Sequence, residues 1–66
     1  MEIMVNGNPK EVSTSVAVGG VVDEHSPSRQ GVAVAVNETV LTRSLWDSTP
    51  LTEGDRIEIV TAMQGG

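Results

Sequence analysis

Two stretches decide the fold: residues 32–36, which read VAVAV, and residues 56–61, which read RIEIVT. In both, apolar side chains recur at every second position, which is the period of a β-strand with one buried face. The alternation places the three valines of the first stretch on one face. In the second stretch it places Ile57 and Ile59 on one face. We therefore expect two strands of a half-buried sheet.

The N-terminal part predicts a hairpin followed by a helix. Residues 2–5 are β-prone, residues 6–9 are strong turn formers, and residues 10–13 would form the returning strand. The period then changes to that of one stripe of a short helix, at Val18, Val21, Val22 and His25. Thr14 or Ser15 would supply a capping hydroxyl at its N-terminal end.

This helix is unfavourable by itself, because Gly19 and Gly20 each cost roughly 1 kcal/mol relative to alanine in a helix interior. We expect tertiary packing to hold it in place. Trp46 is the only aromatic residue and is expected to cap the small core. His25 is expected to be packed or partly exposed and to have no catalytic role.

The remaining segments complete an α+β order. Residues 37–38 would turn the chain, residues 39–41 would pair back briefly, and residues 48–55 are rich in turn formers. Strand, strand, helix, strand, short strand, strand is the β-grasp arrangement, a mixed sheet of four to five strands packed on one short helix. In it the first and last strands can lie parallel at the centre of the sheet. A small, partly open barrel uses similar elements and is the alternative.

Composition excludes several classes of function. The chain has 66 residues, enough for one domain spanning residues 1–66, and a formal net charge of −5. That charge opposes binding to nucleic acid and to anionic membranes. The absence of cysteine and the single histidine argue against a metal site. No leader segment or long apolar run is visible, so we expect a cytoplasmic protein.

The C-terminal segment is the most informative feature. We expect residues 62–66 to form a flexible tail behind the last strand, ending in Gly65 and Gly66. Two glycines remove the side chains beside the carboxylate, so an extended backbone can enter a narrow slot of another protein with its carboxylate first. Joined to AMP, that carboxylate would become an activated anhydride that a sulfur nucleophile can attack. The alternative is a tail with no chemistry.

Taken with the stretches upstream, this tail resembles that of the ThiS family, the sulfur carriers of thiamine biosynthesis. The resemblance is carried by residues 31–38 (GVAVAVNE), 43–46 (RSLW), 51–60 (LTEGDRIEIV) and the final Gly65-Gly66. It covers the C-terminal half closely. In the N-terminal half only the pattern of strand, turn, strand and valine-rich helix agrees.

The resemblance implies a ubiquitin-like fold and a carrier rather than an enzyme. Gly66 would be adenylated by an ATP-dependent enzyme of the ThiF or ubiquitin-activating type, and then converted to a thiocarboxylate. Thiazole synthase would take the sulfur from it. Gly65 and Gln64 would give the carboxylate access to these enzymes. The chain itself would bind no cofactor, since ATP would sit in the activating enzyme.

An apolar patch next to the tail is expected to dock both partner enzymes. Val60 and Ala62 point away from the buried face of the last strand if the alternation continues, and Ala33 and Ala35 line the corresponding thin face of the earlier strand. Nearby acidic residues would form a solvated edge or steer a basic enzyme surface, namely Glu53, Asp55 and Glu58.

Two alternative functions use the same fold. A small subunit of molybdopterin synthase also ends in Gly-Gly and also carries a thiocarboxylate. A ubiquitin-like modifier would instead join Gly66 to lysines of target proteins, and a simple interaction module would use no tail chemistry. An enzyme is the least favoured class, because no nucleophile–base pair, metal spacing or phosphate-binding glycine loop occurs.

Overall fold

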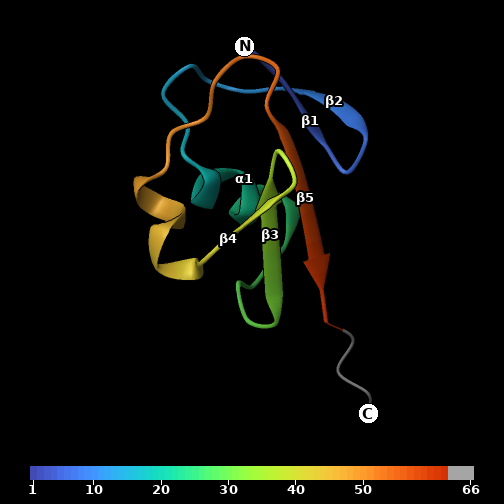
Figure 1. Ribbon diagram of the computed structural model, residues 1–66, viewed down its shortest axis with the longest axis vertical. Coiled ribbons are helices and arrows are strands. Elements are labelled where there is room, and N and C mark those ends of the chain that lie inside the picture. The colour runs from blue at the N-terminus through green and yellow to red at the C-terminus, as the bar shows by residue number, and fades with distance from the viewer. Residues whose placement is uncertain (63–66) are drawn as a thin grey trace.

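The computed structural model describes residues 1–62. They form a five-stranded mixed sheet with one α-helix behind it and one 3-10 helix beside that helix (Figure 1). The elements are β1 (Glu2–Val5), β2 (Asn8–Glu11), α1 (Val18–His25), β3 (Val32–Val36), β4 (Thr39–Leu41), η1 (Arg43–Ser48) and β5 (Arg56–Thr61). Among these residues, no helix is long and apolar enough to span a bilayer.

Strand β5 lies at the centre of the sheet, whose order is β2-β1-β5-β3-β4. It runs parallel to β1, with Val5 opposite Ile57, and antiparallel to β3, with Val34 opposite Ile59. The first and last strands of the chain are therefore neighbours, and the helix crosses one face of the sheet (Figure 1). This is the β-grasp arrangement that the order of elements predicts.

The core fills the space between the sheet and the two helices. The predicted alternation is confirmed, because Ile57 and Ile59 are buried while Arg56, Glu58 and Val60 are exposed. Valines of β3 face the same way, although Val36 is only partly buried. The buried apolar residues are Ile3, Val5, Val18, Val21, Val22, Val32, Val34, Trp46, Leu51, Ile57 and Ile59.

The N-terminal hairpin is tighter than predicted. Its returning strand begins at Asn8, two residues earlier than expected, because Asn6 and Gly7 alone make the turn. Both have positive φ, 51° and 84°, as the two central residues of a type I′ hairpin turn require. Pro9 is tolerated inside β2 because this strand lies at the edge of the sheet.

Helix α1 begins without a side-chain cap, so the prediction that Thr14 or Ser15 would cap it is wrong. Its N-cap residue is Ala17, which forms no side-chain capping hydrogen bond. The Val18 amide instead donates to the Thr49 carbonyl at 3.0 Å. The segment that follows η1 thus satisfies a backbone group that a capping hydroxyl usually takes.

Trp46 of η1 belongs to the core, as expected. Its side chain is 1% exposed, and its indole N–H donates to the Leu41 carbonyl at 3.0 Å. Close to it, the Arg29 guanidinium forms two hydrogen bonds with Asp23, at 2.8 and 2.9 Å, and two with Asp47, at 3.0 and 2.8 Å. Arg29 therefore ties the end of α1 to η1. These hydrogen bonds hold the pKa of both aspartates below the usual range.

Candidate docking face and carrier end

Strand β5 is the last element before the predicted C-terminal tail. Beyond β5, the Ala62 amide still donates to the Gly31 carbonyl at 2.8 Å, so backbone pairing with the neighbouring segment reaches residue 62. The first residue of the predicted tail is thus tied to the body of the protein. The predicted reactive Gly66, and Gly65 and Gln64 that would give it access, lie outside the described residues and stay predictions.

Most of the predicted docking patch comes together on the outer face of the sheet, away from α1. Ala33 lies directly opposite Val60, and Ala35, two residues further along β3, lies opposite Glu58. Val60 is 63% exposed. Ala62 is also exposed, two residues beyond Val60, and by the alternation of the strand it continues the same face. Docking by this patch stays a prediction.

Val40 belongs to this surface, although sequence reasoning did not include it. It lies opposite Ala35 on β4, and its side chain is 78% exposed. The signal that identifies it is the two-residue turn at Asn37 and Glu38, which sets the register of β4 on β3.

A shallow hollow of about 200 Å³ lies within the patch. Its middle is low because the alanines of β3 have small side chains, while Val40 on one side and Val60 on the other rise above them. One charged side chain, that of Glu58, also borders it. We call these residues the docking hollow: Ala33, Val34, Ala35, Val40, Glu58 and Val60.

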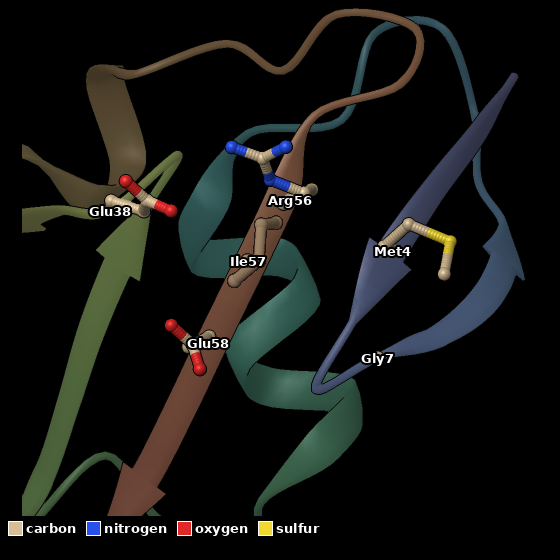
Figure 2. Close-up of a pocket in the computed structure, with 6 residues that line it drawn as sticks. All are labelled: Met4, Gly7, Glu38, Arg56, Ile57 and Glu58. Carbon is tan, nitrogen blue, oxygen red and sulfur yellow. The ribbon is translucent and has the colours of Figure 1, made fainter.

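A second hollow, of about 230 Å³, lies further toward the beginning of β5. Figure 2 shows its lining, with Arg56 and Glu58 on β5, Glu38 at the β3–β4 turn and Met4 on β1. Glu58 borders both hollows. Glu58 is therefore an acidic residue common to the docking hollow and the second hollow.

The three acidic residues that sequence analysis grouped together have different environments. Asp55 accepts hydrogen bonds from the Thr52 amide at 2.8 Å and from the Asn37 side chain at 3.0 Å, and these bonds lower its pKa. Glu53 accepts one from the Glu2 amide at 3.1 Å. The Glu58 carboxylate has no hydrogen-bond or ion-pair partner among residues 1–62. Asp55 thus stabilises a turn, and Glu58 is left to face the patch.

Metal-ligating residues do not gather in the described part of the chain. Residues 1–62 contain no group of three His, Cys, Asp or Glu side chains that could hold a metal ion. His25 is exposed at the end of α1.

The chain is similar in sequence and in fold to known sulfur carrier proteins. The family model described as the ThiS family matches residues 3–66. The sulfur carrier protein ThiS of Thermus thermophilus is 33% identical over 64 residues, which cover 97% of this chain and 98% of that protein. The crystal structure of the thiamine biosynthesis protein ThiS from Geobacter metallireducens superposes with a TM-score of 0.83 at 32% identity, covering the whole of both chains.

A thiazole synthase of Paramagnetospirillum magneticum also matches, at 29% identity over all 66 residues, which make up 20% of that protein. A segment similar to this chain therefore occurs as one part of a much longer polypeptide. Together with the match to the family model over nearly the full length, these similarities show that the chain belongs to the ThiS family, the sulfur carriers of thiamine biosynthesis.

Proposed function

We propose that the carboxylate of Gly66 carries sulfur as a thiocarboxylate. In the first step, a carboxylate oxygen attacks the α-phosphorus of ATP in an activating enzyme of the ThiF type, and pyrophosphate leaves. In the second, a sulfur nucleophile attacks the acyl carbon, and AMP leaves. When the nucleophile is hydrosulfide, the product is the thiocarboxylate and no oxidation or reduction is needed.

The position of β5 is the observation that carries this proposal. The strand is held on both sides, by β1 and by β3, and the ladder reaches Ala62. The final residues therefore begin at a fixed point of the sheet, beside the exposed patch formed by Val60 and Ala33. A partner that binds this patch receives the Gly65-Gly66 end at a defined place, which is what positioning a reacting group requires.

The carrier itself performs no catalysis and binds no cofactor in this proposal. ATP sits in the activating enzyme, and thiazole synthase consumes the thiocarboxylate. The match between this chain and one fifth of a thiazole synthase supports the second partner, because joining a carrier-like segment to that enzyme raises its effective concentration there. A cytoplasmic location stays a prediction.

The decisive experiment is an intact-mass measurement of the protein isolated from cells that contain its natural partners. We expect a mass increase that matches replacement of one oxygen by sulfur, located by fragmentation at Gly66. The control is a variant that lacks Gly66, in which the increase should disappear. An unmodified end that also resists ATP-dependent adenylation in vitro would refute the proposal.

A growth test distinguishes the thiamine pathway from the molybdopterin pathway. The gene should restore growth to a strain that requires thiazole and should not restore a molybdopterin-deficient one. Higher-mass conjugates on cellular proteins would instead identify a modifier.

A further inference from the structure

The cations of this protein are distributed unevenly between its two faces. All four lysine and arginine side chains lie among residues 1–62, and three contact groups near the helices. Lys10 pairs with Glu24 at 2.9 Å, and Arg29 pairs with two aspartates. Arg43 lies over the Trp46 ring, 5.6 Å from its centroid, and donates to a backbone carbonyl at 3.0 Å. Of these four side chains, the outer face therefore retains only Arg56.

Arg56 does not neutralise Glu58. The two residues lie on the same face of β5, but no ion pair joins them. Figure 2 shows the Arg56 guanidinium pointing away from the Glu58 carboxylate, toward the start of the strand. Glu38, which borders the second hollow together with Arg56 and Glu58, is also acidic. Within the described residues, the Glu58 carboxylate at the docking hollow thus has no ion-pair partner.

The docking hollow combines two chemical features that one type of side chain matches. Its alanines and valines offer apolar surface, and the Glu58 carboxylate stands at its border. An arginine has an aliphatic stem that packs on apolar surface and a guanidinium that binds a carboxylate with two hydrogen bonds. Lysine presents a more strongly hydrated point charge, so arginine is the better match for a site that loses water on binding.

We infer that the docking hollow receives an arginine of the activating enzyme, whose stem lies on Ala33 and Ala35 and whose guanidinium pairs with Glu58. This inference rests on the proposed function and specifies how the carrier is recognised. An apolar hollow alone could bind many apolar protein surfaces. A partner that has no cation at this place would bury the Glu58 carboxylate unpaired, and this cost opposes its binding. Glu58 is therefore a specificity-determining residue of this face.

The test compares two variants that change the net charge equally. Glu58→Gln removes the carboxylate at the hollow and keeps the shape of the side chain. Glu2→Gln is the matched control, because Glu2 lies on the same face of the sheet at the start of β1 and borders neither hollow. Urea unfolding of both variants verifies that they remain folded.

The measurement is ATP–pyrophosphate exchange by a ThiF-type activating enzyme from the same cells, with the carrier concentration varied. Since a hydrogen-bonded charge contributes about 1.5–3 kcal/mol, Glu58→Gln should raise the KM for the carrier about tenfold or more and leave kcat unchanged. Glu2→Gln should change KM less than about twofold. The difference between wild type and Glu58→Gln should shrink as salt is added.

Each other outcome has a defined meaning. Equal increases of KM in both variants would show steering by total charge and would overturn the inference, as would no increase in Glu58→Gln. A lower kcat with unchanged KM would also overturn it. All three leave the proposed function intact, because wild type is still adenylated. Failure of wild type to support exchange refutes the proposed function itself, and the inference with it.

Discussion

Gly19 of α1 and Asp47 of η1 approach each other so closely that a methyl group on Gly19 would overlap the Asp47 carboxylate. The same methyl group would lie 2.7 Å from the Arg29 guanidinium. A residue that weakens the helix locally is therefore what allows η1 to pack on it. The contact also places both aspartate partners of Arg29 within its reach.

Gly19→Ala should stabilise the protein less than Gly20→Ala does, although both add the same helix former. The added Cβ must displace the ends of the Asp47 and Arg29 side chains and disturb the hydrogen bonds between them, and this opposes the roughly 1 kcal/mol gained in helix propensity. Gly20→Ala is the matched control, because its Cβ would meet only a Val16 methyl group at 3.0 Å. Urea unfolding should show Gly19→Ala to be the less stable of the two. Equal stabilities would contradict this account of the contact.

Stability should fall in acid partly through Asp55. Hydrogen bonds from the Thr52 amide and the Asn37 side chain lower its pKa below 3.8 in the folded state. The stabilisation is therefore present above that value and is lost as the pH falls through the folded pKa. Asp55→Asn removes this titration, so the stability difference between wild type and variant should narrow from pH 6 to pH 2.5 in urea unfolding. A difference that is independent of pH would contradict the assignment.

A charge placed on the docking patch should weaken recognition without unfolding the protein. Val60→Asp and Ala33→Asp alter exposed positions that lie opposite each other, so the core remains intact. Burying the new carboxylate against an apolar partner surface is costly, and we expect the KM for the carrier in pyrophosphate exchange to rise about tenfold or more. Leu45→Asp is the control, because Leu45 is 47% exposed on η1, outside the patch. Unchanged adenylation and sulfur delivery in the two patch variants would refute docking at this patch.

One alanine appended after Gly66 should abolish the carrier function. The carboxylate would move by about 3.3–3.6 Å, and displacements of even 1 Å can cost about 100-fold in rate when a reacting group is held in place. Pyrophosphate exchange with protein of verified mass measures the effect, and urea unfolding should be unchanged. Exchange at the wild-type rate would show that the position of the chain end does not matter.

The periodicity of apolar residues predicted which faces of the strands and of the helix are buried. The valines of β3 and the isoleucines of β5 face the core because an alternating strand has only one apolar face to bury. The stripe at Val18, Val21 and Val22 is buried for the corresponding reason in a helix. Both turns at Asn6 and Asn37 were expected, and only the length of the first was wrong.

Several contacts between distant segments were not predicted. Gly19 was interpreted as a weakness, because nothing in a helix of eight residues reveals that Asp47 packs against it. Arg29 was not singled out, since its two aspartate partners are 6 and 18 residues away along the chain. The absence of a side-chain cap at α1 was missed for the same reason, because the group that bonds the first helical amide is the carbonyl of the distant Thr49.

The central position of β5 also determines when the sheet can form during synthesis. Since β5 leaves the ribosome after every other strand, a chain that stops before Arg56 lacks the strand that joins β1 to β3, and the five-stranded order cannot form. Val60 and Glu58, which a partner would recognise, belong to that same strand. Under the proposed function, an unfinished chain would therefore present no docking face to the activating enzyme before its Gly66 end has also been made.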